Sequence, residues 1–314
     1  MSTCFGDSGT ESNGYTSIAM SKSSSSASNT TTSTSLAEAS PLEGIEHVGI
    51  NQFVGIANMR KAIDLQSQRL QEGVSNQQYL VFRPVTEIDL AKIDSARHSI
   101  GKHTRMTYYT DINLLVIKLM PSGKHESAHL SFSDELRAKL FGMGISHREL
   151  RPMGGTRYPG HTSSKEGDSC YKPSSRKKEA NWPTIVIESG LSESLQRLRY
   201  DARWWLENSD GKVKIVVIIL IKLADKRLQV EKWELAPLDE IMPVTRSHPG
   251  TQTLIPTQIQ EITIMPNNSV AGAPPLVLEF QKIFLRLAIP PESDTTFTAE
   301  DLSNWADVFW ESVE

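Results

Sequence analysis

The sequence contains little cysteine, and this absence excludes two classes of protein. Its 314 residues include two cysteines, Cys4 and Cys170. That number is too small for a disulfide-stapled extracellular framework or for an all-cysteine zinc site. We therefore expect two free thiols in a reducing compartment and an intracellular location, in the cytoplasm or the nucleus.

Long apolar runs and an excess of positive charge are also absent. The longest apolar run covers residues 215–221, which is far too short to cross a bilayer as a helix, so no membrane association is expected. The formal net charge is -4, so binding of nucleic acid would need a local basic patch rather than a global field. We find no glycine-rich phosphate loop, nucleophile elbow or redox dithiol.

The N-terminal stretch differs in composition from the rest of the chain. Residues 1–42 are dominated by serine, threonine, glycine and asparagine, which bury too little apolar surface to offset the conformational entropy lost on folding. We interpret this stretch as a disordered, low-complexity tail. The apolar content of 38% over the whole chain is adequate for a packed core. Residues 43–314 are therefore predicted to form a single domain.

The spacing of apolar residues predicts both helices and strands in this domain. Helices are expected at residues 58–73, 131–142, 192–208 and from 298 onward, and strands at 79–82, 111–120, 183–188, 213–223, 229–235, 258–265 and 276–287. The strand at 229–235 is expected at the edge of its sheet. Residues 151–181, rich in glycine, serine, lysine and arginine, are interpreted mainly as a mobile surface loop.

The block from 183 to 223 carries the clearest fold signal. A strand is followed by a helix and then by a long, nearly continuous apolar strand. Leu191, Leu195, Leu198, Ala202 and Trp205 fall on one stripe of the helix. This order predicts a parallel pair of strands covered on both faces. The expected fold class is α/β, or mixed α+β, with a central mixed sheet flanked by helices.

Glu188 is the residue in this block that needs an explanation. It ends the apolar strand, where an unpaired charge is costly to bury and where open α/β sheets place ligands. Two interpretations remain open. Glu188 is either a functional carboxylate, or a structural one that pairs with Arg197 or Arg199 or caps the following helix near Ser192.

Four motifs lie around Glu188. They are Trp182-Pro-Thr-Ile-Val-Ile-Glu-Ser-Gly190, Ser192-Glu-Ser194, Asp201-Ala-Arg-Trp-Trp-Leu206 and Lys212-Val-Lys-Ile-Val216. Together they resemble a family of uncharacterised fungal proteins related to the PD-(D/E)XK superfamily of restriction-endonuclease-like and Uma2-type domains. The resemblance implies a nuclease-like core at about residues 165–237 with a C-terminal extension of strands and a helix.

In that fold, two acids on adjacent strands hold a divalent cation, and a lysine two positions after the second acid helps to activate water. The resemblance implies that Asp168 and Glu188 bind magnesium, with Glu166 as the fallback first acid. The separation of Asp168 and Glu188 suits a hairpin. Gly190 stands where the lysine is expected, and Lys214 on the next strand is the candidate replacement. The alternative for Lys214 is a solvated charge at the start of a strand.

Two functions therefore remain open. The first is a magnesium-dependent nuclease that hydrolyses phosphodiester bonds in DNA or RNA, with Asp168, Glu188 and Lys214 as its catalytic residues. The second is a catalytically inactive descendant that keeps the fold as a binding or scaffold module. In either case the basic loop at residues 172–178 is the expected surface for nucleic acid or another partner.

Overall fold

The computed structural model describes residues 40–101, 103–120, 123–191, 195–238 and 253–313. Apart from residues 40–42, the predicted tail lies outside these ranges. Within them, Leu42 packs on an apolar cluster and the carbonyl of Pro41 accepts a hydrogen bond of 2.7 Å from Arg197. No helix in the described ranges is long and apolar enough to span a membrane.

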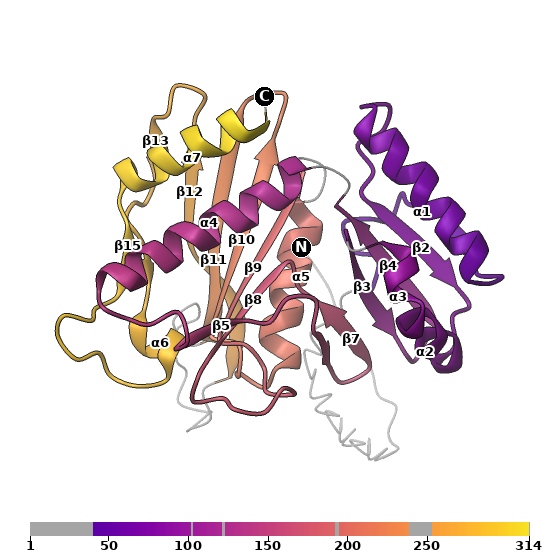
Figure 1. The fold of residues 1–314 in the computed structure, drawn as a ribbon, viewed down its shortest axis with the longest axis horizontal. Helices are drawn as coiled ribbons and strands as arrows, with labels where there is room; N and C mark the ends of the chain where they lie inside the picture. The colour runs from indigo at the N-terminus through magenta and orange to yellow at the C-terminus, as the bar shows by residue number, and fades with distance from the viewer. Residues whose placement is uncertain (1–39, 102, 121–122, 192–194, 239–252, 314) are drawn as a thin grey trace, which may run out of the picture. The chain divides into compact units, whose positions relative to one another are not determined.

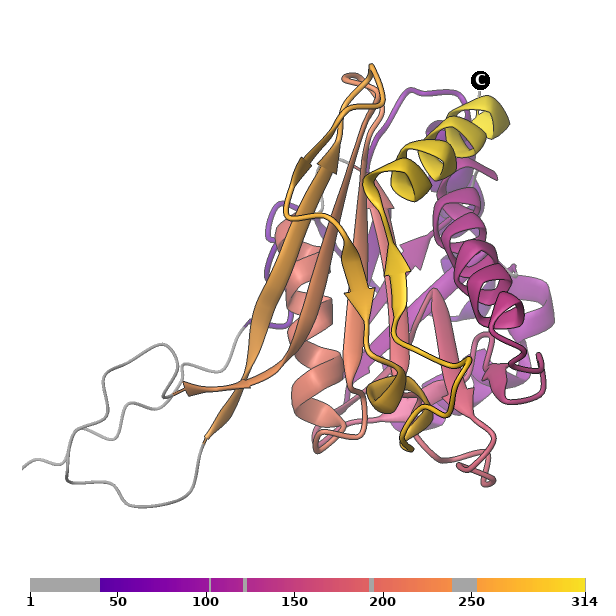
Figure 2. The same cartoon turned by 90° about the vertical axis from the view of Figure 1, so that its left-hand side faces the viewer.

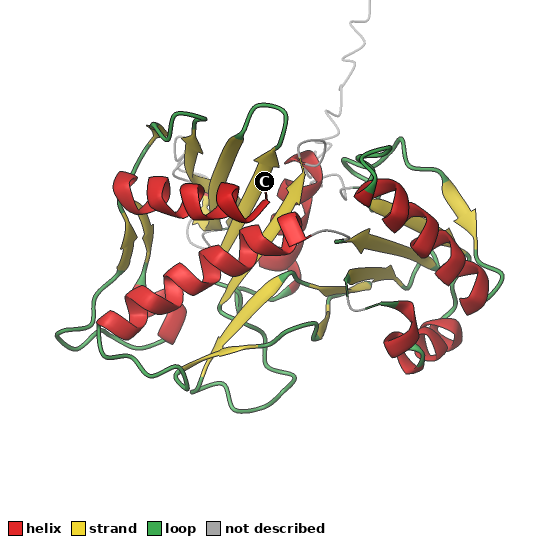
Figure 3. Cartoon of the chain, turned by 45° about the horizontal axis from the view of Figure 1, so that its top comes forward, coloured by secondary structure: helices red, strands yellow, loops and turns green. Residues whose placement is uncertain are grey.

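The first half of the described chain forms a six-stranded sheet, whose order is β1-β2-β4-β3-β7-β6. Its strands are β1 (Ile50–Gln52), β2 (Tyr79–Arg83), β3 (Thr104–Tyr109), β4 (Leu114–Leu119), β6 (Arg157–Pro159) and β7 (Ser163–Glu166). Helices α1 (Ile56–Gln71), α2 (Glu87–Ser95) and α3 (Arg97–Ile100) cover one face of it (Figure 3). Strand β1 is parallel to β2, and the other pairs are antiparallel.

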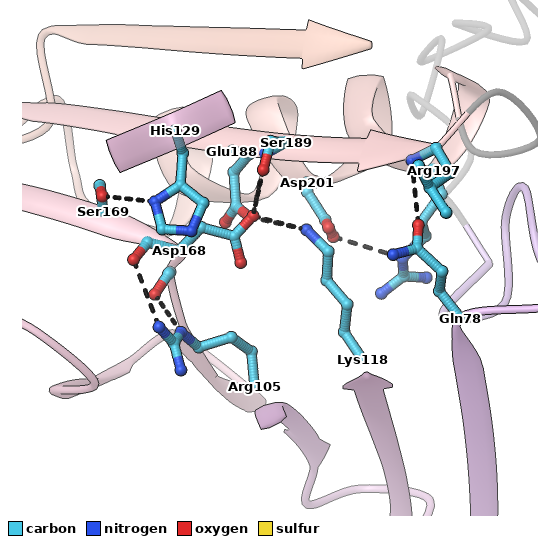
Figure 4. A network of polar contacts seen from close by, with 12 residues as sticks. Gln78, Arg105, Lys118, His129, Asp168, Ser169, Glu188, Ser189, Arg197 and Asp201 are labelled. Atoms are coloured by element: carbon cyan, nitrogen blue, oxygen red, sulfur yellow. Dashed lines mark hydrogen bonds and ion pairs between the residues drawn. The ribbon is translucent and has the colours of Figure 1, made fainter. Parts of the chain in front are cut away.

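Strand β4 determines where one buried lysine points. Ile117 and Leu119 pack with the helices on one face, whereas Leu114 and Val116 pack on the opposite face. Because side chains alternate along a strand, Lys118 lies on the same face as Leu114 and Val116. It therefore points away from the helices and toward the second sheet (Figure 4).

The second sheet has seven strands in the order β13-β12-β11-β10-β9-β8-β5. Its strands are β5 (Leu150–Pro152), β8 (Ser169–Pro173), β9 (Ile185–Leu191), β10 (Ile215–Lys222), β11 (Arg227–Pro237), β12 (Leu254–Ile264) and β13 (Val270–Gly272). β9 and β10 are parallel, as predicted, and the other neighbours are antiparallel. The predicted edge position of the strand at 229–235 is wrong, because β12 and β13 lie beyond β11.

Helices cover both faces of this sheet (Figures 1 and 2). Helix α5 (Leu195–Asn208) packs on one face through the predicted stripe from Leu195 to Trp205, whereas Leu191, also assigned to that stripe, ends β9. Helices α4 (Gly123–Gly142) and α7 (Ala299–Val313) pack on the other face. Thr298 and Asp301 cap α7 reciprocally, as predicted. A two-stranded antiparallel sheet of β14 (Leu276–Leu278) and β15 (Thr295–Phe297), with helix α6 (Phe280–Phe284) in the connection between them, completes the fold. The predicted α/β class with a central mixed sheet flanked by helices is confirmed.

Two further predictions of local structure are wrong. The segment 151–181 is not a surface loop throughout, because β6, β7 and β8 lie in it and bury polar side chains that find charged partners. The predicted strand at 276–287 ends at Leu278. Phe280, Ile283 and Phe284 follow at helical spacing and enter the core, which favours α6 over a longer strand.

Candidate functional site

The hairpin formed by β8 and β9 brings the two predicted acids together. Ser169 pairs with Ile187 in this antiparallel hairpin, so Asp168 lies next to Glu188 on the neighbouring strand. Asp168 is 3% exposed and Glu188 is 0% exposed. The predicted hairpin is therefore confirmed, and both carboxylates lie in the interior.

Lys118 connects the two carboxylates (Figure 4). Its Nζ lies 2.8 Å from Oδ2 of Asp168 and 3.4 Å from Oε2 of Glu188. Burial by itself disfavours the charged lysine, but the neighbouring Asp168 and Glu188 carboxylates outweigh it and raise the pKa of Lys118 above its ordinary value. Lys118 is therefore an ammonium ion at neutral pH. It lies on β4 of the six-stranded sheet, whereas Glu188 lies on β9 of the seven-stranded sheet.

A second lysine lies on the other side of Glu188. Nζ of Lys165, from β7, is 3.7 Å from Oε1 of Glu188 and 3.1 Å from Oδ1 of Asp201. The same Oε1 accepts a hydrogen bond of 2.7 Å from the indole of Trp205. Asp201 also pairs with Arg197, one helical turn away, at 3.3 Å. Both oxygens of Glu188 thus face a cation.

The backbone amide of Ser189 and the side chain of Arg105 hold Asp168 and the residue before it in place. The amide of Ser189 donates a hydrogen bond of 2.9 Å to Oδ2 of Asp168. Arg105, from β3, donates to the carbonyl oxygens of Gly167 at 2.9 Å and of Asp168 at 3.5 Å (Figure 4). These contacts fix the carboxylate in place, and two of them come from the six-stranded sheet.

The cluster balances its charge internally. Its three carboxylates and three cations belong to Asp168, Glu188, Asp201, Lys118, Lys165 and Arg197. The exposure of these six side chains lies between 0% and 5%. Burial raises the pKa of Glu188, an effect that Lys165 opposes. The cluster therefore has no net charge when all six groups are ionised.

These residues do not fit a bound magnesium ion. Magnesium needs oxygen ligands at about 2.0–2.1 Å and usually keeps several water molecules. The place between Asp168 and Glu188 is occupied by the ammonium of Lys118 at 2.8 and 3.4 Å. In the part of the chain that the structure describes, no three histidine, cysteine, aspartate or glutamate side chains are grouped to hold a metal.

The structure does not bring Lys214 to this cluster. Lys214 immediately precedes Ile215, which pairs with Ile185, whereas Glu188 pairs with Ile218. Four residues of strand, at about 3.3 Å each, separate Lys214 from the level of Glu188. Lys214 lies instead at the opposite end of β9, where burial lowers its pKa.

The fallback acid belongs to a different cluster. Glu166 lies 2.6 Å from Arg97 and 3.0 Å from Arg157, and it is 5% exposed. Its carboxylate also accepts a hydrogen bond of 3.2 Å from the amide of Met106. Glu166 is therefore held within the six-stranded sheet and its helices.

The predicted pairing of Glu188 with Arg197 or Arg199 is wrong, because its carboxylate contacts Lys118, Lys165 and Trp205 instead. Arg197 pairs with Asp201, and the guanidinium of Arg199 contacts Glu231 on β11. The proposed helix cap near Ser192 lies outside the described residues. The sequence reasoning missed Lys118, although a lysine inside an otherwise apolar strand needs a buried partner and is itself a signal.

Two cations of the basic loop at residues 172–178 donate hydrogen bonds to backbone carbonyl groups of the protein itself. Nζ of Lys172 donates to the carbonyl oxygens of Lys178 at 2.7 Å and Glu179 at 3.3 Å. Arg176 donates to the carbonyl of Trp182 at 2.6 Å and to two further carbonyls. Lys177 and Lys178 remain exposed. These two lysines are the exposed cations of the loop.

Comparison with known proteins gives likenesses among solved structures. No protein-family model and no curated protein matches the chain. Among solved structures, the chain is similar to a putative nuclease belonging to DUF820 from Anabaena variabilis. The identity is 15% and the TM-score is 0.35, over 64% of this chain and 90% of that one. At this level we draw no conclusion on activity from the likeness.

Proposed function

We propose that this chain is a catalytically inactive protein of nuclease-like fold that serves as a binding or scaffold module. The observation that carries the proposal is the position of the Lys118 ammonium between the buried carboxylates of Asp168 and Glu188. Metal-assisted hydrolysis of a phosphodiester needs acids that are free to bind a cation and a site that the substrate can reach. Here the acids are neutralised by lysines and are at most 3% exposed.

Electrostatics supports the same proposal. Two adjacent carboxylates attract a divalent cation when their charges repel each other without compensation. Lys118 and Lys165 remove that repulsion. A cation would have to displace the ammonium of Lys118 from the protein interior before it could bind. We therefore expect the wild-type protein to bind neither magnesium nor manganese at this cluster.

Calorimetry and nuclease assays test this function. Titration of the wild-type protein with magnesium or manganese at millimolar concentration should give no heat of binding and no rise in melting temperature. Plasmid DNA and RNA should remain intact. Metal-dependent cleavage by the wild type that is absent in Glu188→Gln would contradict the proposal, since this near-isosteric change removes the charge of the acid and largely keeps its shape.

The second candidate function is a magnesium-dependent nuclease acting on DNA or RNA. One observation favours it: the register of β8 and β9 brings Asp168 and Glu188, the two acids that the resemblance names, side by side. The same assays separate the two functions. Cleavage lost in both Asp168→Asn and Glu188→Gln would support the nuclease.

A binding role also needs a partner, and we propose nucleic acid at the exposed part of the basic loop. Lys177 and Lys178 are its exposed cations. Binding through phosphate contacts should weaken steeply as salt rises. Filter binding with single- and double-stranded probes should therefore show a salt-dependent affinity that falls in Lys177→Gln/Lys178→Gln. Binding that is unchanged in this double variant would exclude the loop.

A further inference from the structure

The further inference concerns the role of the buried acidic pair, and it rests on the proposed inactive function. We propose that Lys118 is an internal cation that takes the place of a divalent metal ion. The pair of Asp168 and Glu188 then acts as a socket by which the seven-stranded sheet holds the six-stranded sheet.

The first support is the origin of the cations. Lys118 lies on β4, Lys165 on β7 and Arg105 on β3, so all three come from the six-stranded sheet. Each of them contacts a carboxylate or carbonyl oxygen near the hairpin of β8 and β9. One sheet thus supplies positive charge and the other supplies acceptors. This division is what an electrostatic contact between two sheets requires.

The second support is a polar contact beside the socket that joins the same two sheets. Gln78, immediately before β2, accepts a hydrogen bond of 3.0 Å from the amide of Leu191 at the end of β9. Its side-chain amide donates to the carbonyl of Leu119, next to Lys118, at 3.4 Å. Gln78 therefore links the backbone of β4 next to Lys118 to the end of β9.

The third support is the chemistry of the acceptors. Oδ2 of Asp168 and Oε2 of Glu188 both reach the position of Nζ of Lys118, at 2.8 and 3.4 Å. Carboxylate oxygens are the ligands that magnesium and manganese prefer. A variant without the ammonium would keep these two acids buried, with Lys165 beside Glu188 but no cation between the two carboxylates, and would have room at the same position. The inference therefore predicts that this variant gains a response to divalent cations that the wild type lacks.

The experiment measures melting temperature of purified full-length protein with and without manganese chloride, against sodium chloride at equal ionic strength to control for screening. In Lys118→Ala, manganese should raise the melting temperature by about 3 °C or more when its concentration exceeds the dissociation constant tenfold. The wild type and Lys214→Ala, a lysine variant away from the socket, should not respond. Lys118→Ala/Glu188→Gln should lose the response, because it lacks one of the two acids.

A second variant covers the case in which Lys118→Ala does not fold. Lys118→Gln keeps a hydrogen-bond donor, removes the charge and is one atom shorter than lysine, which leaves the position of the ammonium open, and it should show the same gain. Failure of manganese to stabilise any folded Lys118 variant, with the wild type also unresponsive, overturns this inference and leaves the proposed inactive function standing. A response of the wild type itself contradicts the proposed function instead.

Discussion

Removal of Lys165 provides the most direct measure of how the buried cluster is balanced. Lys165→Met keeps most of the aliphatic volume and removes a charge that lies 3.1 Å from Asp201 and 3.7 Å from Glu188. Asp201 keeps Arg197 as a partner, and Glu188 keeps Lys118. The variant therefore carries one uncompensated negative charge in the interior.

The expected cost follows from that charge. Removing one partner of a buried ion pair destabilises a protein by about 3–5 kcal/mol. For a chain of this size, each kcal/mol lowers the melting temperature by roughly 2–4 °C. We therefore expect a fall in melting temperature of the order of 10 °C. Lys214→Met, at the other end of β9, should change stability by less than about 0.5 kcal/mol.

The cost should also depend on pH. Burial raises the pKa of Glu188 above its ordinary value of 4.5, and loss of the opposing Lys165 should raise it further. A carboxyl group whose pKa is raised in the folded state binds its proton there more tightly than in the unfolded state. Its contribution to stability is thus present at low pH and is lost as pH rises through the window above 4.5. Lys165→Met should lose less stability at acidic pH than at alkaline pH.

Urea unfolding followed by tryptophan fluorescence at both ends of this range measures the effect. Lys165→Met/Glu188→Gln should recover part of the lost stability, since the amide needs no cation. Equal losses at acidic and alkaline pH, or a loss as small as that of Lys214→Met, would refute the reasoning, because Lys165 would then not compensate Glu188.

Three further predictions concern packing and the tail. Trp205→Phe should cost about 1.5–3 kcal/mol in urea unfolding, because it removes a hydrogen bond to the charged carboxylate of Glu188. Trp204→Phe removes a hydrogen bond to the neutral hydroxyl of Ser163 and should cost about 1 kcal/mol. Equal costs for the two variants would contradict this difference between the acceptors. Leu198→Ala should cost about 2–5 kcal/mol because the side chain is 0% exposed, and an unchanged urea midpoint would contradict its place in the core. Deletion of residues 1–39, which offer almost no periodic apolar face, should leave the melting temperature within about 2 °C of the full chain by calorimetry.

The sequence by itself determined the local elements and the pairing that follows from short connections. The apolar stripe of α5 between two apolar strands was sufficient to predict the parallel pair of β9 and β10, because a strand, helix and strand in succession return the chain to the same edge. The hairpin that places Asp168 beside Glu188 was predictable for the same reason, since β8 and β9 are close along the chain. Their proposed role as catalytic ligands stays a prediction.

Only the tertiary structure decided which cations contact Asp168 and Glu188. Lys118 is 50 residues from Asp168 and 70 from Glu188 along the chain. Strand alternation assigns Lys118 to a face of β4, but it does not say which surface will pack on that face. Lys214, only 26 residues after Glu188 and on the adjoining strand, lies away from it because the register of β10 against β9 sets their separation. Which charges share the interior depends on how two sheets dock, and that depends on the packing of both surfaces rather than on any local pattern.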